Sequence, residues 1–216
     1  MLVPGCPRCS SVVTEWAGAW ACDDHGPTPP LWRPSEVTYE AFSEHLRRTP
    51  TFPTYLPWPL GPGWQVGDFA LVGTPGGAPG AHGTSSATMT CATGISALDG
   101  PVEVMVVAEE PGVGLGARCA GTAGADPGED LGRGTPAVRV RIGHQAVPLW
   151  TVSTSAADDR FDRSVVAGEA YGRWLWIVLR PASAILLLRD DWILKDVSGL
   201  GPPLVELPFG GTRPTW

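Results

Sequence analysis

The pattern of apolar and polar positions predicts a chain built mainly from β-strands beyond residue 64. Arg139 and Arg141 alternate with Val138, Val140 and Ile142, a two-residue period that is typical of a sheet with one solvent-facing side. Glycine-rich segments separate the apolar stretches, which favours short strands joined by turns. The predicted strands cover residues 64–73, 84–92, 102–108, 136–142, 147–152, 163–169, 172–180 and 203–207.

Three stretches of this region have distinct patterns. Residues 174–179 (Trp-Leu-Trp-Ile-Val-Leu) are apolar at every position, which predicts a central strand with both faces buried. Residues 183–197 are ambiguous, because Ser183–Leu188 could form a helix behind Pro181 and Trp192–Val197 could form a strand. The glycine-rich residues 74–83 are predicted to form a flexible loop.

The region before residue 64 is rich in proline and holds one predicted helix. Ser35 is a plausible N-cap for a helix that ends near Arg48, and Glu44 can reach the basic residues one turn later. Residues 27–34 contain several prolines and predict an extended linker. Residues 57–64 have prolines too dense for a helix or a central strand, so they predict a rigid approach to the main domain.

Four candidate metal ligands occupy two short steps near the N-terminus. Cys6 and Cys9, and then Cys22 and His25, are each separated by two residues, so one tight turn can aim both side chains at the same point. The residues between the pairs read as two short strands bent near Gly18, which would bring the pairs together. We predict a structural zinc ribbon, because four protein ligands complete the tetrahedral shell of zinc.

Two other interpretations of these cysteines remain open. They could form a disulfide beside an unrelated histidine, or a redox pair, although a redox Cys-x-x-Cys pair normally begins a helix and here β-branched residues follow. Cys91 and Cys119 lie outside the ribbon and read as small core residues rather than as a redox pair. Five cysteines, with no N-terminal signal-peptide pattern, favour the reducing cytoplasm.

These patterns predict an α+β or mainly β fold in three parts. Residues 1–26 form the zinc ribbon, residues 27–63 form a Pro-rich linker with one helix at about 35–48, and residues 64–216 form a mostly antiparallel β-domain. The net charge is −7, and the ribbon sets Arg8 against three acidic residues, which disfavours binding to nucleic-acid phosphates. No apolar run reaches the length of a transmembrane helix, so we expect no membrane contact.

A second candidate site lies in residues 108–121. Two carboxylates follow a predicted strand, three glycines alternate after them, and an arginine completes the segment. Backbone N–H groups of such a turn can approach an anion that the arginine also binds, yet an ordered loop held by a Glu–Arg pair is the simpler interpretation. The candidate ligand-binding residues here are Glu109, Glu110, Gly112, Gly114, Gly116 and Arg118.

A further acidic and aromatic turn lies at residues 168–174. Glu169 and Trp174 are further candidate ligand-binding residues. Glu169 could accept hydrogen bonds from Arg118, Arg173 or a tryptophan indole. We interpret Glu169 as a buried structural carboxylate rather than a catalytic one, because an active site would need an unpaired carboxylate with a raised pKa.

These motifs together resemble an uncharacterised zinc-ribbon family of actinobacteria across nearly the whole chain. The resemblance implies a structural zinc but no established activity. Some members carry a phosphotransacetylase label, for which this chain has no matching acyl-phosphate pattern, and Cys119 replaces an expected aromatic residue. The segments that carry the resemblance are Cys6–Cys9, Trp20–Gly26, Pro57–Trp64, Ala108–Arg118, Gly168–Leu179 and Asp196–Gly210.

The favoured function is a non-enzymatic binding or regulatory protein that contacts a protein partner or a small ligand through exposed tryptophans and glycine loops. One alternative is an enzyme acting on an anionic small molecule, with Glu109, Glu110, Arg118 and Glu169 around one cleft. A second alternative is a nucleic-acid adaptor, which predicts salt-dependent binding to DNA or RNA.

Overall fold

The computed structural model describes residues 4–74, 83–152, 162–189 and 192–216 and confirms the mainly β fold. Most strands join one ten-stranded mixed sheet, in which only β9 and β13 are paired in parallel among the strand pairs described. Three short strands near the N-terminus form a separate antiparallel sheet. In order across the large sheet, the strands are β4 (Leu31–Trp32), β6 (Gln65–Thr74), β7 (Thr84–Ser96), β8 (Gly100–Glu109), β12 (Arg173–Arg180), β11 (Ser164–Ala170), β10 (Gln145–Thr151), β9 (Val138–Ile142), β13 (Ile193–Asp196) and β5 (Tyr55–Pro57).

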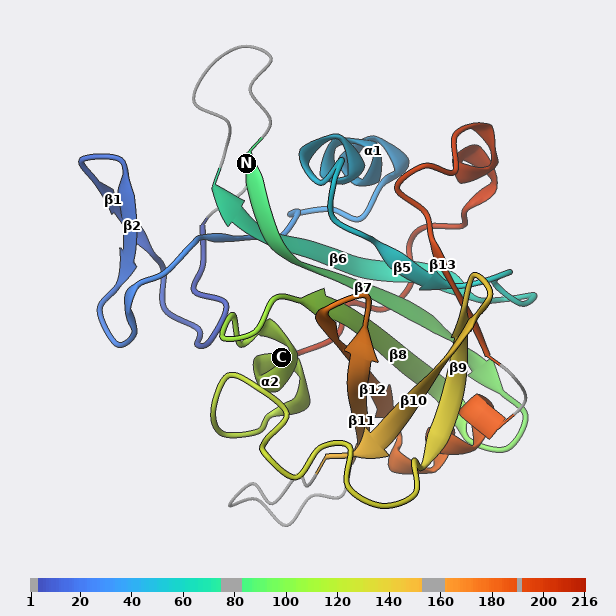
Figure 1. Cartoon of the computed structure of the whole chain (residues 1–216). Helices are drawn as coiled ribbons and strands as arrows, with labels where there is room; N and C mark the ends of the chain where they lie inside the picture. Colours follow the sequence, from blue (N-terminus) through green and yellow to red (C-terminus); the bar gives the residue numbers. More distant parts are fainter. Residues whose placement is uncertain (1–3, 75–82, 153–161, 190–191) are drawn as a thin grey trace.

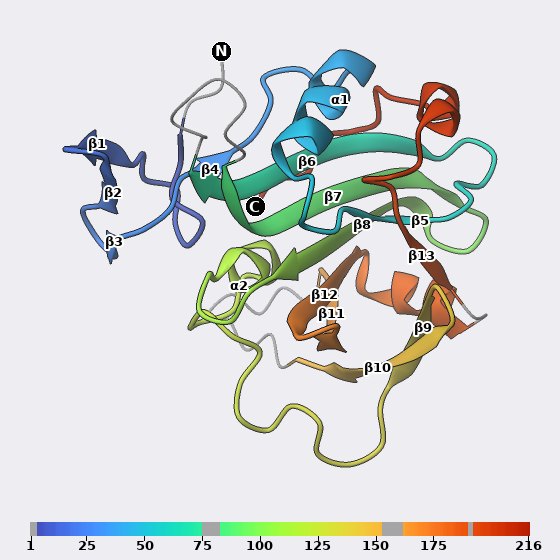
Figure 2. The same cartoon turned by 45° about the horizontal axis from the view of Figure 1, so that its top comes forward.

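The large sheet curls so that its edge strand β5 returns to the face of β7. The hydroxyl of Thr88 donates to the carbonyl of Pro53 at 2.6 Å, and the hydroxyl of Thr90 donates to the carbonyl of Tyr55 at 2.5 Å. Figure 2 shows β6, β7 and β8 as one wall and β9 to β12 as the opposite wall, with β5 and β13 at one side. The concave side therefore encloses an apolar core, to which β8 contributes from the first wall and β9 to β12 contribute from the other.

Strand β12 is central and buried on both faces, as its uniformly apolar sequence predicts. Leu175, Ile177 and Leu179 point into the concave core, whereas Trp176 and Val178 join a second cluster on the convex side. Successive side chains of a strand alternate between faces, so a strand with covered faces on both sides has no polar positions. The alternation predicted for β9 is confirmed as well, since Val140 and Ile142 are buried between exposed arginines.

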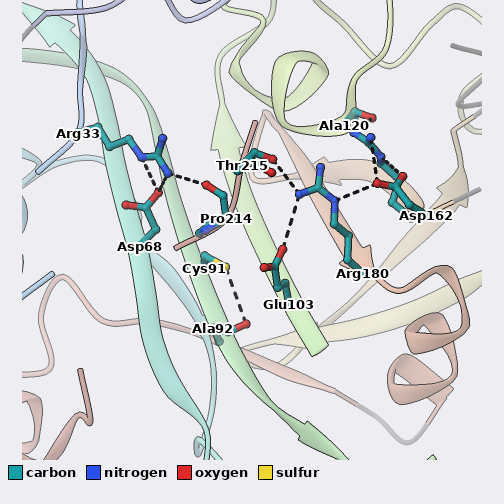
Figure 3. A network of polar contacts seen from close by, with 11 residues as sticks. Arg33, Asp68, Cys91, Ala92, Glu103, Ala120, Asp162, Arg180, Pro214 and Thr215 are labelled. Atoms are coloured by element: carbon teal, nitrogen blue, oxygen red, sulfur yellow. Dashed lines mark hydrogen bonds and ion pairs between the residues drawn. The ribbon is translucent and has the colours of Figure 1, made fainter. Parts of the chain in front are cut away.

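The convex side is covered by the short helix α2 (Leu115–Ala120) and by the segment that ends at Trp216. Figure 3 shows how polar contacts hold this segment across the strands. Arg33 pairs with the fully buried Asp68 at 2.6 Å and donates to the carbonyl of Pro214 at 2.8 Å. Arg180 donates to the carbonyl of Thr215 at 2.8 Å. Two arginines thus hold consecutive carbonyl groups of this segment against the convex face.

Helix α1 (Tyr39–Arg48) begins later than the sequence suggested. Its N-cap is Thr38, whose hydroxyl accepts a hydrogen bond from the Ala41 amide at 3.2 Å, so the assignment of Ser35 was wrong. Threonine caps a helix as serine does, and the β-branched pair at 37–38 disfavours an earlier start. The predicted pairing of Glu44 with the basic residues of the next turn is confirmed.

In the C-terminal third, the helix and the strand considered for residues 183–197 both occur, whereas a strand predicted further on does not. Both alternatives for residues 183–197 occur, as the 3₁₀ helix η1 (Ala182–Arg189) and strand β13. The strand predicted at 203–207 is wrong, because Pro202–Glu206 forms the 3₁₀ helix η2. Its two leading prolines lack the N–H groups that a sheet requires and suit a first helical turn.

The Pro-rich region predicted as a linker supplies β4, α1 and β5 to the structure. Most of the loop predicted at 74–83 lies outside the described residues. Within the described chain, none of the helices combines the length and apolarity required to cross a bilayer.

Candidate metal centre

The N-terminal finger is built from two tight turns and a hairpin. Strands β1 (Thr14–Trp16) and β2 (Ala19–Cys22) pair through a two-residue turn whose residues both have positive φ, 51° at Ala17 and 80° at Gly18. Strand β3 (Gly26–Pro27) pairs with β2 and begins at Gly26, where a φ of 67° lets the chain leave the second ligand pair. The hairpin and the bend near Gly18 agree with the sequence interpretation.

The hairpin brings Cys6, Cys9, Cys22 and His25 together. Their ligand atoms all lie within 4.8 Å of one another. Cys6 Sγ lies 3.7 Å from His25 Nδ1, Cys9 Sγ lies 3.7 Å from Cys22 Sγ, and Cys22 Sγ lies 3.6 Å from His25 Nδ1. Four ligands at bond lengths of about 2.3 Å around a tetrahedral ion stand about 3.8 Å apart, so the cluster has the dimensions to hold such an ion.

The finger is continuous with the large sheet. Gly5 and Leu31 exchange two backbone hydrogen bonds of 2.9 and 2.8 Å, and Leu31 belongs to β4 at the sheet edge. The ring of Trp20 in β2 meets that of Trp32 in β4 edge-on, with centroids 5.8 Å apart. Figure 1 shows the finger projecting beyond the end of β6. The ligand Cys6 follows Gly5 directly, so the cluster is tied to the sheet by backbone bonds.

Two arginines add contacts between the finger and the convex side. Arg8 lies between the first two ligands. Its Nε donates to the carbonyl of Val113 at 3.1 Å, and its Nη2 donates to the carbonyl of Gly112. Arg118 donates to the carbonyl of Cys6 and lies 4.8 Å from the centroid of the Trp216 ring. The glycine-rich segment, a candidate ligand site in the sequence analysis, therefore also contacts the finger.

The anion held by the glycine-rich turn is the protein's own carboxylate. Glu109 is completely buried, and its Oε2 accepts hydrogen bonds from the amides of Leu115 at 2.7 Å and Gly116 at 3.2 Å, at the start of α2. Its other oxygen makes no hydrogen bond, and the described contacts of Arg118 go elsewhere. The predicted approach of backbone N–H groups to an anion occurs, but a Glu–Arg pair is not what orders the turn.

Burial controls the charge of Glu109. Removal from water raises the pKa of its carboxyl group from 4.5 to about 7, and the two amide hydrogen bonds oppose this only in part. The main cause is desolvation, and the charge of Asp126 makes a smaller contribution, so the pKa of Glu109 depends chiefly on the apolar packing of α2 against β8 and β12. A carboxyl group that ionises near neutral pH in this way makes the stability of the fold dependent on pH.

Glycine 116 is required by the close approach of α2 to Trp176. A Cβ atom at this position would lie 2.3 Å from the indole ring, which is shorter than any real contact. We expect Gly116→Ala to destabilise the protein by about 1–3 kcal/mol, the usual cost of overpacking a core. Urea unfolding at fixed pH measures the change. Gly199→Ala is the matched control, because nothing lies within 4 Å of its added Cβ, and an equal effect of both substitutions would contradict this packing.

Two of the remaining candidates differ from Glu109 in their exposure. Glu110 is exposed, and Glu169 is exposed rather than buried, so the interpretation of Glu169 as a buried carboxylate was wrong. Trp174 stands between Glu109 and Glu169 in register across β8, β12 and β11. Whether any of these residues binds a ligand stays a prediction.

The described structure contains buried polar and thiol groups for which the sequence analysis predicts no functional role. His45 is buried on α1, with Nε2 3.2 Å from the Thr54 hydroxyl, and burial lowers its pKa from 6.5 to about 3. Cys91 and Cys119 are both free and fully buried, which favours the core interpretation. The apolar stripe of α1 could have indicated the burial of His45, but the Thr54 contact is not visible in local sequence.

A family described as "Family of unknown function (DUF6758)" matches residues 2–216. The chain belongs to this family. The expected resemblance to a family of unknown function, spanning nearly the whole chain, is thereby confirmed. No curated protein and no solved structure matches the chain. Membership of DUF6758 assigns no activity. The Cys6, Cys9, Cys22 and His25 cluster and the residues around it are the features of this DUF6758 chain that bear on its role.

Proposed function

We propose that the chain is a non-enzymatic binding or regulatory protein of the cytosol, whose N-terminal finger is fastened by a structural zinc ion. The observation that carries the proposal is the gathering of Cys6, Cys9, Cys22 and His25 within 4.8 Å. Three sulfur ligands and one imidazole suit zinc among the common cellular metals, because thiolates are soft donors that magnesium and calcium avoid. Free thiols outside the cluster suit a reducing compartment.

A structural role is supported by the number of ligands and by their attachment. Four protein ligands complete a tetrahedral shell, whereas catalytic zinc sites keep a position open for water or substrate. The hydrogen bonds from Gly5 to Leu31 and from Arg118 to Cys6 fix the finger against the sheet. A small finger buries little apolar surface of its own, so metal binding supplies folding free energy that packing cannot.

The candidate catalytic residues support a binding role over an enzymatic one. The buried oxygen of Glu109 is bonded to the start of α2, and Arg118 is engaged with Cys6 and Trp216. Neither side chain lines the three cavities described, of about 310, 750 and 350 Å³. The cytosolic role, the zinc and an unidentified protein or small-molecule partner together make up the proposal.

Metal analysis of the full chain tests this proposal. The protein is purified without chelator, and native mass spectrometry with elemental analysis is expected to give one zinc ion per chain. Removal of the metal with a chelator is expected to collapse the backbone amide resonances of residues 4–27 and to leave those of β7, β8 and β12 dispersed. A finger that stays folded with no metal bound would contradict the proposal.

A further inference from the structure

A second candidate site lies far from the finger, at one end of the curled sheet. A cavity of about 750 Å³ opens between β5, the end of β9, the β11–β12 hairpin and β13. Two other cavities measure about 310 and 350 Å³. Small-molecule sites typically occupy about 300–1,000 Å³ and often lie at the mouth of a β-barrel. No residue of the finger or of the glycine-rich turn lines this cavity.

Arg173 brings an uncompensated positive charge to the wall of this cavity. Its guanidinium lies 4.6 Å from the centroid of the Phe52 ring, and its buried Nε has no hydrogen-bond partner. Among the described residues it makes no ion pair with a carboxylate. A buried N–H group without a partner is costly, and a common explanation is a ligand that completes the bond. A guanidinium matches the two oxygens of a phosphate or carboxylate.

Asp196, the acidic residue that lines the cavity, accepts hydrogen bonds from neighbouring residues. One oxygen of Asp196 accepts hydrogen bonds from the amide of Thr54 at 3.1 Å and from the amide and hydroxyl of Ser198 at 3.0 and 2.7 Å. These bonds hold the carboxylate at the β13 end and leave the charge of Arg173 unpaired. In a chain with a net charge of −7, a lining arginine with no acidic partner marks a site for an anion.

Two tyrosines stand beside Arg173. Burial raises the pKa of Tyr55 to about 12, with a further contribution from the charge of Asp196, so its hydroxyl remains a hydrogen-bond donor at neutral pH. Tyr171 has a φ of 54°, a left-handed conformation that a bulky side chain rarely adopts, in the two-residue turn that it forms with Gly172. Its hydroxyl donates to the carbonyl of Ile142 at 3.4 Å across the rim.

The strain at Tyr171 suggests that this residue serves more than the turn. Asparagine or glycine would form the same turn without the cost of the left-handed conformation. Backbone outliers of this kind concentrate at ligand sites, where the surrounding structure holds them. Here the aromatic side chain is placed on the wall of the cavity next to the unpaired guanidinium.

We infer that this cavity binds a small organic anion, whose phosphate or carboxylate head group pairs with Arg173 and whose apolar body lies against Tyr55 and Tyr171. The inference deepens the proposed binding function by naming the class of ligand, and it rests on that function only in assuming that the ligand is bound rather than converted. It does not depend on zinc, because the cavity and the metal cluster share no residue.

Isothermal titration of the full chain with three matched aromatic probes tests the inference. Phenyl phosphate and benzoate are expected to bind saturably at one site, and neutral benzyl alcohol is expected not to bind. The stronger of the two anions identifies the head group, and inorganic phosphate shows whether the aromatic body contributes. Absence of saturable binding for both anions, or equal binding of benzyl alcohol, would overturn the inference.

Substitution and spectroscopy locate the site. Arg173→Met is expected to weaken anion binding about tenfold or more, the effect of losing a charged hydrogen bond. Arg139→Met, on an exposed residue of β9 that does not line the cavity, is expected to leave it unchanged. Should Arg173→Met fail to fold, titration of the unsubstituted chain has to shift the amide resonances of Tyr171 and Gly172, and shifts confined to other regions would overturn the inference.

The same samples separate this inference from the proposed function. Phosphorus NMR of phenyl phosphate after incubation is expected to show the ester intact. Its conversion to free phosphate would contradict the non-enzymatic function while supporting the cavity as an anion site. A chain that binds the anion but holds no metal would contradict the zinc proposal and leave the anion site supported.

Discussion

Replacing Cys22 with serine is expected to release the metal ion and unfold the finger while the large sheet stays folded. Structural zinc in small fingers contributes about 10–16 kcal/mol of apparent binding free energy, so the loss of one thiolate removes most of the free energy that folds residues 4–27. The two main cores draw almost no side chain from the finger, so they should keep their packing.

Limited trypsin digestion with metal analysis measures this effect. The Cys22→Ser chain should lose stoichiometric zinc and become sensitive at Arg8, whose contacts with Gly112 and Val113 hold it against the turn before α2. His25→Cys is the matched control, because a four-cysteine site still binds zinc and should remain protected. A Cys22→Ser chain that retains one zinc and full protection would contradict the assigned ligands.

The metal cluster could be predicted from sequence because its determinants are local. Two ligands on one tight turn, repeated after a hairpin, fix most of the geometry within 20 residues of chain. The strands were predictable for the same reason, since a two-residue period is a property of neighbouring positions. The docking of the finger was not, because Arg8 and Arg118 meet partners more than 100 residues away.

The wrong prediction that Glu169 is buried has a physical cause that also explains the burial of Glu109. Both Glu109 and Glu169 follow apolar runs at strand ends, so the local pattern treats them alike. Their environments differ because α2 packs over Trp176 and closes on Glu109, whereas Glu169 is exposed on β11. Burial of a carboxylate is thus decided by the tertiary pairing of strands and helix, which no local period encodes.

The buried residues Glu109 and His45 are expected to change the free energy of unfolding in opposite directions as the pH falls. Glu109 has a pKa raised to about 7, so between pH 4.5 and 7 the folded chain binds a proton that the unfolded chain releases, and stability falls as pH rises. His45 has a pKa lowered to about 3, so below pH 6.5 the unfolded chain binds a proton that the folded chain excludes, and stability falls as pH falls.

The two effects offset one another near neutrality and can be separated by substitution. From pH 8 to pH 5.5, ionisation linkage gives a gain of about 2 kcal/mol from Glu109 and a loss of about 1.5 kcal/mol from His45. Glu109→Gln keeps an oxygen that can accept from Leu115 and Gly116, and His45→Gln keeps a polar group that can reach Thr54. Each variant therefore removes a titration without removing the local hydrogen bond.

Urea unfolding of the parent, both variants and the double variant at pH 5.5 and 8 measures the two contributions. Relative to the parent, Glu109→Gln should lose about 2 kcal/mol of the gain on acidification, and His45→Gln should lose about 1.5 kcal/mol of the opposing fall. The two residues belong to separate packing regions, α1 on β6 and α2 on β8, so the double variant should show the sum of both changes. Equal pH slopes for the parent and Glu109→Gln would mean that the carboxylate is solvated, which would contradict the closed packing of α2 over Trp176.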